Sequence, residues 1–255
     1  MLGIYFSGTG NSRYALETFL RHYNNSAKTV AIEDKSAAKL IEQHQDFIFS
    51  YPVQYSNIPK MLRDFIDQNS RLWNGKRIFV IATMALFSGD GAGILGRHLQ
   101  RYGAHITGGL HLKMPDSISD VKALKRPPEQ NKLTVKKAER KIAWAAKRMA
   151  QGRPPQEGIG LLPHFAGLFG QRLYFMGKMK RYSNKLKVDP AKCIGCGRCA
   201  ALCPMCSIRM EKGKAKAGDR CTMCYRCVNS CPKQAITLLG KKVVAQGTIE
   251  TYLAP

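Results

Sequence analysis

Eight of the nine cysteines of this 255-residue chain repeat one spacing, and this repeat constrains the fold more than any other feature of the sequence. The segments CIGCGRCAALCP and CTMCYRCVNSCP, which start at Cys193 and Cys221, both read C-x2-C-x2-C-x3-C-P and lie 28 residues apart. Clustered thiols would suggest disulfides in a secreted chain, but in a cytosolic chain they more often bind metal. Two-residue gaps also allow one curved loop to aim three thiolates at one centre. The repeat therefore predicts two metal centres.

The complete run with its proline resembles that of the bacterial two-cluster ferredoxins. In that family, the first three cysteines of one run and the last cysteine of the other hold one 4Fe–4S cluster. The resemblance implies one cluster on Cys193, Cys196, Cys199 and Cys231, and a second on Cys221, Cys224, Cys227 and Cys203. A pair of zinc sites is the alternative, because CxxC pairs also bind zinc, but zinc does not explain the complete run occurring twice.

Three other residues near the cysteines have predicted roles. Gly195 and Gly197 suit a strained loop in which backbone N–H groups approach cluster sulfur closely. Cys206 falls outside the repeat, and we expect it to be a small buried side chain near a cluster rather than a ligand.

Residues 1–120 alternate between short apolar runs and helical patterns. The apolar runs at 2–6, 29–32, 46–51, 77–84 and 106–114 are typical of strands in a buried sheet. Between them, residues 58–68 place Met61, Leu62, Phe65 and Ile66 on one helix face. Five strands separated by helices predict an α/β fold with a doubly wound parallel sheet.

The loop SGTGNS, at residues 7–12, follows the first predicted strand and suggests a phosphate site. It lacks the third glycine of the dinucleotide fingerprint, because Arg13 stands there, and it lacks the lysine of the Walker loop. It resembles the flavodoxin loop that binds the phosphate of FMN, S/T-x-T-G-x-S/T. That resemblance implies the strand order 2-1-3-4-5 and a phosphate held by hydroxyls and by backbone N–H groups at a helix start. The candidate residues are Ser7, Gly8, Thr9, Gly10, Asn11 and Ser12.

Two more loops lie where the flavodoxin order would place the flavin ring, over the carboxyl ends of the strands. They are YPVQYSNIP at 51–59 and TMALFSGDGAG at 83–93, and Tyr55 or Phe87 could stack on the ring. Surface aromatic residues are the alternative interpretation of both. The candidate flavin-binding residues in these loops are Pro52, Val53, Tyr55, Thr83, Phe87, Ser88, Gly89 and Asp90.

The charge is strongly basic, with 41 lysines and arginines against 17 acids and a net charge of +24, which favours anionic partners. Residues 121–187 hold 17 of these cations and three acids. Within them, Val135, Ala138, Ile142, Ala145 and Met149 recur at helical spacing, and a second apolar helical pattern spans 165–179. We expect both helices to pack against neighbouring domains, and a membrane-surface or partner-binding face is the alternative.

Taken whole, the chain resembles the EFR-type ferredoxins, which fuse a flavodoxin-like domain to a two-cluster ferredoxin. The resemblance implies an electron carrier or oxidoreductase component that moves electrons between FMN and two 4Fe–4S clusters and on to a protein partner. The basic charge favours an acidic partner. One alternative is a flavin-dependent reductase of a small molecule, although no acid–base pair or other catalytic residue is predicted. A second alternative is a redox-sensing binder of nucleic acid or of membrane surfaces, although no nucleic-acid motif accompanies the charge.

The predicted organisation has four parts. They are a flavodoxin-like FMN-binding domain at 1–120, a basic helical connecting segment at 121–187, a ferredoxin domain with an α+β fold at 188–240, and a C-terminal tail at 241–255. No apolar run reaches the 18 or so residues that span a bilayer, and the N-terminus lacks signal-peptide features, so we expect a cytoplasmic protein.

Overall fold

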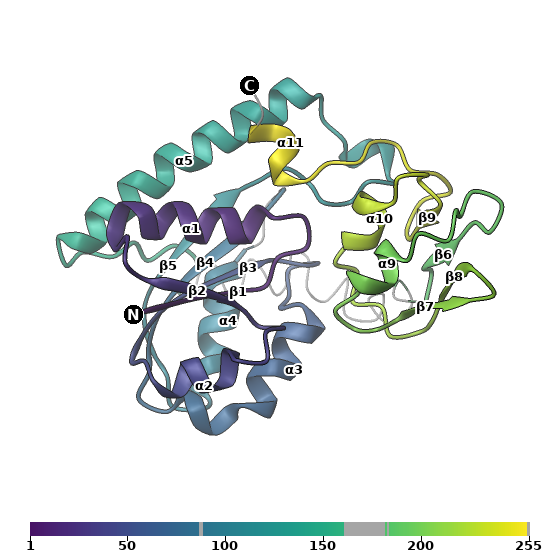
Figure 1. Cartoon of the computed structure of the whole chain (residues 1–255). Helices are drawn as coiled ribbons and strands as arrows, with labels where there is room; N and C mark the ends of the chain where they lie inside the picture. Colours follow the sequence, from purple (N-terminus) through teal and green to yellow (C-terminus); the bar gives the residue numbers. More distant parts are fainter. Residues whose placement is uncertain (87–88, 161–181, 183, 254–255) are drawn as a thin grey trace.

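A parallel sheet of five strands forms the centre of the larger unit in the computed structural model, which describes residues 1–86, 89–160, 182 and 184–253. The strand order is β2-β1-β3-β4-β5 (Figure 1). The strands are β1 (Leu2–Tyr5), β2 (Lys28–Ala31), β3 (Asp46–Pro52), β4 (Arg77–Met84) and β5 (His105–Lys113). The predicted strands, their parallel pairing and the flavodoxin-like order are therefore confirmed.

Helices cover both faces of this sheet (Figure 1). Apolar side chains of α1 (Asn11–Tyr23) and α5 (Pro128–Ala150) pack on one face. Those of α2 (Ala37–Glu42), α3 (Lys60–Gln68) and α4 (Gly91–Gln100) pack on the other. Two short 3-10 turns, at Ser70–Trp73 and Lys122–Leu124, complete the unit. Because both faces are covered, the central strands are apolar along almost their whole length.

Helix α5 lies in the basic segment but belongs to this layered unit. It begins at Pro128, a residue whose fixed φ suits a first helical turn. Val135, Ala138, Ile142 and Ala145 are buried against α1 and β5, and burial of a side chain such as Ile142 stabilises the fold by about 1.5–3 kcal/mol. The expectation that this helix packs on a neighbouring domain is confirmed. The helix predicted at 165–179 lies outside the described residues.

A second unit carries the cysteines (Figure 1). Its two antiparallel pairs are β6 (Lys187–Val188) with β9 (Ile236–Thr237), and β7 (Ile208–Glu211) with β8 (Lys214–Ala217). Two short helices, α9 (Arg198–Ala201) and α10 (Arg226–Ser230), follow the cysteine loops. Ile208 and Ile236, which hold equal positions in the 28-residue repeat, are both buried in its small core.

The C-terminal segment returns to the sheet unit. There α11 (Ile249–Leu253) packs on α5, and the Ile249 amide donates to the Thr9 carbonyl at 2.9 Å. Thus α5, from the predicted connecting segment, packs on elements of residues 1–120, and α11, from the predicted tail, contacts both α5 and Thr9. Among the described residues, no helix combines the length and apolarity needed to cross a bilayer.

Candidate functional site

The loop between β1 and α1 has the backbone of an anion site. Gly10 precedes α1 with φ +90°, and a Cβ atom there would lie 2.4 Å from Cγ2 of Ile249, so both conformation and space call for glycine. The first amides of the 13-residue helix α1 have no acceptor within the helix. Such a helix start favours a phosphate through its N–H groups and its dipole.

Some polar side chains of this loop lack hydrogen-bond partners in the described part of the chain. The hydroxyl of Ser7 and the side-chain carbonyl oxygen of Asn11 are buried and lack hydrogen-bond partners among the described residues. The Ser12 hydroxyl instead pairs with that of Thr83 at 2.7 Å, which ties the loop to the end of β4. A phosphate in the loop would supply the acceptor that the Ser7 hydroxyl lacks, so the residues present fit the predicted group.

A cavity of about 260 Å³ opens beside this loop. Nine predicted flavin-binding residues line it, namely Ser7, Gly8, Thr9, Asn11, Ser12, Pro52, Val53, Tyr55 and Thr83. Gly10, Gly89 and Asp90 do not line it. Asp90 is instead fully buried at the start of α4, where it forms an ion pair with Arg97. Phe87 and Ser88 lie outside the described residues.

The loop after β3 makes its turn without glycine. Tyr55 and Ser56 both adopt left-handed conformations, with φ of +50° and +56°. Such residues cost about 1–2 kcal/mol each and persist where the surroundings require them, commonly at functional sites. The ring of Tyr55 lines the cavity and lies 5.7 Å from the ring of Tyr182, and burial raises the pKa of the Tyr55 phenol.

Other residues of the cavity were not predicted. Met114, Pro115, Asp116, Ser117 and Ile118 follow β5, and Met223, Cys224 and Tyr225 come from the second cysteine run. The first group could have been found, because the carboxyl end of the fifth strand reaches the same sheet edge. The second group has no local signal, because its contacts with the sheet unit join segments more than 100 residues apart.

The eight repeated cysteines gather in two sets. One small cavity is lined by Cys203, Cys221, Cys224 and Cys227. Another is lined by Cys193, Cys196, Cys199 and Cys231. Each set combines three cysteines of one run with the last cysteine of the other, as the resemblance to ferredoxins implies. Exposed Cys206 lies in neither lining, so the expectation of a buried ninth cysteine is wrong.

Backbone amides point at the sulfurs of both sets. The last cysteines of the two runs, Cys203 and Cys231, each accept from the amide four residues later, at 3.2 Å. Cys221 accepts from Met223, and a similar bond from Ala215 lowers the pKa of Cys193. Such N–H groups stabilise negative charge on cluster sulfur, so the two sets fit 4Fe–4S clusters. Among the described residues, no three ligand side chains converge on one single-ion position.

The two cysteine loops share a backbone shape but differ in sequence. Gly195 and Gly197 have φ of +73° and +70°. Their counterparts 28 residues later, Met223 and Tyr225, are also left-handed, at +57° and +61°. The second loop therefore accepts strain that glycine would avoid, and both of its side chains line the cavity beside the phosphate loop.

The second cysteine loop lies directly on the phosphate loop. A Cβ atom added to Gly8 would be 2.2 Å from the carbonyl oxygen of Cys224, so the two backbones touch there. Buried Asp120 anchors the same region, since its carboxylate accepts from the Tyr225 hydroxyl at 2.9 Å and from the Leu238 amide at 2.6 Å. Cys224 borders both the cavity beside the phosphate loop and its own cysteine set.

The fold and the two cysteine sets define the class of this protein, a flavodoxin-like unit joined to a ferredoxin-like iron–sulfur unit. Residues 185–232 match the family described as the 4Fe-4S dicluster domain. A ferredoxin of Thermococcus litoralis is 42% identical over 57 residues, which cover 21% of this chain and 97% of that protein. Through this segment, the chain belongs to the ferredoxins that carry a 4Fe–4S dicluster domain.

Three further matches cover little of the relative or share little sequence identity with it. A stretch of 68 residues is 35% identical to UacF of Escherichia coli, and it covers 25% of this chain and 11% of UacF. The solved flavodoxin of Megasphaera elsdenii is 18% identical, with a TM-score of 0.42, and the match covers 58% of this chain and 99% of that one. A flavodoxin of Fusobacterium nucleatum, solved with flavin mononucleotide, is 11% identical with a TM-score of 0.40, and the match covers 60% of this chain and 98% of that one.

Proposed function

We propose that this chain is an electron-transfer protein of the EFR type, which holds FMN and two 4Fe–4S clusters and exchanges electrons with a protein partner. The observation that carries the proposal is the position of Cys224, which lines both the cavity beside the phosphate loop and the second cysteine set. Electron transfer requires closely spaced redox centres, and this shared wall brings two predicted centres together. FMN handles one or two electrons, and each cluster handles one.

The residues assigned to the two clusters differ in their surroundings. In the second set, none of the four cysteines is exposed, and burial raises the pKa of the Cys227 thiol, so bound iron would be needed to keep a thiolate there. In the first set, Cys196 is exposed, and neighbouring Ile194 is 57% exposed. We therefore assign the first set to exchange with the partner and the second set to exchange with the flavin.

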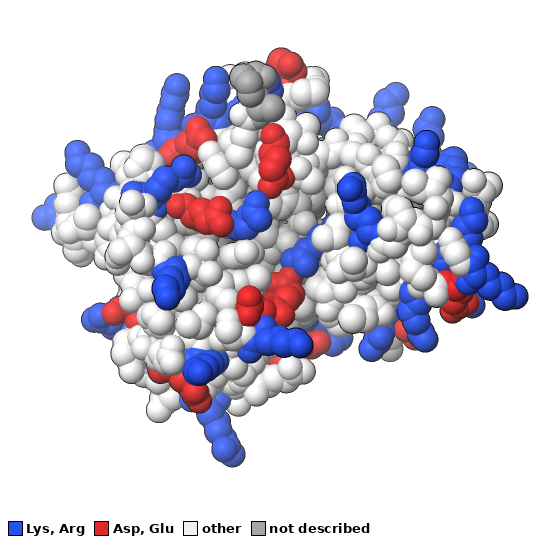
Figure 2. Space-filling model, viewed as in Figure 1, with Lys and Arg blue, Asp and Glu red and all other residues white. Residues whose placement is uncertain are grey.

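We assign partner docking to the outer face of α5. Lys136, Arg140 and Lys147 are exposed there, together with Trp144, which is 48% exposed and packs beside Arg148. Figure 2 shows lysines and arginines projecting along the upper edge, over α5, and around the cysteine-containing unit. This charge suits an acidic redox protein, because opposite charges speed encounter and orient the partner. A cytoplasmic location is part of the proposal.

Anaerobic purification followed by chemical analysis tests the proposal. We expect one FMN and about eight iron atoms with matching acid-labile sulfide per chain. Reduction of the clusters by a one-electron donor should then also reduce the flavin, measured as the loss of absorption beyond that of an FMN-free sample, which tests communication between the centres. Zinc without labile sulfide would contradict the cluster assignment, and iron–sulfur protein that does not bind added FMN would contradict the flavin assignment.

A further inference from the structure

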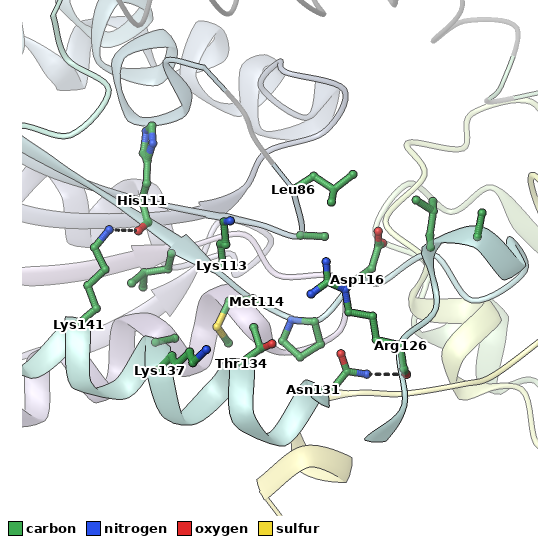
Figure 3. A pocket seen from close by; sticks show the side chains of 16 residues that line it. Leu86, His111, Lys113, Met114, Asp116, Arg126, Asn131, Thr134, Lys137 and Lys141 are labelled. Carbon is green, nitrogen blue, oxygen red and sulfur yellow. Dashed lines mark hydrogen bonds between the residues drawn. The ribbon is translucent and has the colours of Figure 1, made fainter. Parts of the chain in front are cut away.

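A cavity of about 500 Å³ lies between the end of β5 and the first half of α5 (Figure 3). Four cationic side chains from three parts of the chain line it: Lys113 ends β5, Arg126 precedes α5, and Lys137 and Lys141 belong to α5. Asp116 is the acidic residue of its lining in the described part of the chain. The cavity is therefore strongly cationic.

The charge of one of these four cations is already paired, because Lys141 donates to the Glu157 carboxylate at 2.7 Å and to the His111 carbonyl at 2.9 Å. The other three cations, Lys113, Arg126 and Lys137, are exposed to solvent, and within the described residues their charged groups make no hydrogen bond and no ion pair shorter than 4.0 Å. Burial raises the pKa of Asp116, and nearby Arg126 opposes that rise. Because like charges around one space repel each other, an anion bound among them would be favoured.

The remaining lining indicates the kind of anion. Leu86, Leu112, Met114 and Leu124 contribute apolar surface to the same cavity. A bare inorganic ion would leave that surface unused, whereas an organic molecule with charged groups and a carbon skeleton would contact both kinds of wall. Pockets for small molecules commonly combine apolar walls with a few charged groups that fix orientation.

This cavity adjoins the one beside the phosphate loop. The two share six lining residues, namely Ala85, Leu86, Met114, Pro115, Asp116 and Leu124. A molecule in the cationic cavity would therefore lie next to whatever occupies the other. In Figure 3, Leu86 and Asp116 stand on the side of the cavity away from Lys141.

We propose that the cationic cavity binds a small organic molecule with two or more carboxylate or phosphate groups, held by Lys113, Arg126 and Lys137. The anion site depends only on these residues. The position of its ligand beside a flavin rests on the proposed function.

Isothermal titration calorimetry on the full-length protein saturated with FMN tests the proposal, with citrate and inorganic pyrophosphate as probes at constant ionic strength. We expect saturable binding of one molecule of at least one probe, and the stronger probe distinguishes a carboxylate ligand from a phosphate ligand. The K113Q/R126Q/K137Q variant should bind at least tenfold more weakly. The K35Q/K39Q/K122Q variant removes the same charge from positions outside the cavity lining, and it should bind like the parent.

Iron content, FMN content and the thermal midpoint of each variant would show that folding is intact. The proposal would be overturned if neither citrate nor pyrophosphate bound saturably, or if both triple variants weakened probe binding equally. A citrate titration of the protein without added FMN separates the two proposals: binding that is lost only in K113Q/R126Q/K137Q supports the anion site even if FMN never binds. A change in the flavin absorption spectrum on citrate binding would support the predicted contact between ligand and flavin.

Discussion

Arg226 donates from both Nε and Nη2 to the main-chain carbonyl of Ser7, at 3.0 and 2.8 Å. One arginine thus joins the start of α10, in the second cysteine run, to the first residue of the phosphate loop. The same guanidinium forms an ion pair with Glu33 and lies 5.6 Å from the centre of the Phe6 ring. Arg226 therefore fixes the phosphate loop against the iron–sulfur unit.

Replacing Arg226 by glutamine should weaken FMN binding about tenfold, because hydrogen bonds to charged groups contribute ~1.5–3 kcal/mol and their loss would loosen the loop. Fluorescence titration of FMN measures the effect. Arg198 provides the matched control, because it holds the same repeat position but is exposed and, within the described part of the chain, its guanidinium reaches only the Ser230 carbonyl, at 3.5 Å. If Arg226→Gln and Arg198→Gln bound FMN with equal affinity, the role of Arg226 would be refuted.

Gly8→Ala should separate the two loops. The added methyl group would meet the Cys224 carbonyl at 2.2 Å, and neither backbone can yield without moving its loop. We expect weaker FMN binding and slower flavin reduction after the clusters are reduced, with iron content unchanged. Gly96→Ala is the control, since its methyl group would lie 3.3 Å from the flexible Ile106 side chain and alanine favours the helix. An unchanged rate of flavin reduction in Gly8→Ala would show that this contact does not contribute to electron transfer between the clusters and the flavin.

The cysteine sets predict which single substitutions share an effect. Cys203→Ser should perturb the same paramagnetic resonance signal as Cys224→Ser, and Cys231→Ser the same signal as Cys196→Ser, because each pair lines one cavity. Cys206→Ser should leave iron content unchanged, since Cys206 lies in neither lining. If Cys203→Ser and Cys196→Ser altered one common signal, the crossed assignment would be wrong.

The charge of α5 predicts a salt-dependent reaction with acidic redox proteins. Converting Lys136, Arg140 and Lys147 to glutamate should slow electron transfer to an acidic ferredoxin or flavoprotein at least tenfold at low salt, while both cofactors stay bound. In the parent protein, the rate should fall steeply between low and physiological salt as exposed charges are screened. Stopped-flow measurements across a salt series would decide. A flat response and an unchanged rate in the variant would exclude docking through this face, and loss of binding to anionic vesicles or DNA would favour those partners instead.

His111 predicts a pH dependence of stability. Its Nε2 accepts from the Ala92 amide at 3.0 Å, and burial lowers its pKa below the usual 6.5; nearby Glu157 and Asp90 oppose the shift, while Lys141 adds to it. The unfolded chain therefore binds the proton more readily, so stability falls as the pH drops from 6.5 toward the lower folded pKa. The thermal midpoint should fall more steeply for the parent than for His111→Gln between pH 7.5 and 5. If the thermal midpoints of the parent and of His111→Gln fell in parallel over this pH range, His111 would not be the source of the pH dependence.

Some of the site could be predicted from the sequence because its chemistry fixes a local spacing. Three thiolates that share one cluster must lie on a short loop, so the run that starts at Cys193 and its copy at Cys221 are readable without a structure. The sheet is readable for a similar reason, because strands covered on both faces must be continuously apolar, as at Arg77–Met84.

The contacts between the units could not be predicted in this way. Asp120 stands at the predicted domain boundary, yet its buried carboxylate accepts bonds from residues more than 100 positions away. Tyr225 holds a backbone conformation that its counterpart Gly197 holds more easily, and no local pattern marks that choice. Asp90 resembled a flavin-loop residue in sequence, but its carboxylate turns inward to Arg97. Long-range packing decides each of these positions.

The return of the chain at α11 has a mechanical consequence. The iron–sulfur unit is attached to the sheet unit at two points, once after α5 and again where Ile249 bonds to Thr9. A module on one flexible tether can swing between near and far positions, and its internal electron exchange then slows as solvent viscosity rises. With two attachments and the contacts at Asp120 and Arg226, such swinging is blocked. Exchange between the centres should therefore proceed at the same rate in glycerol as in water.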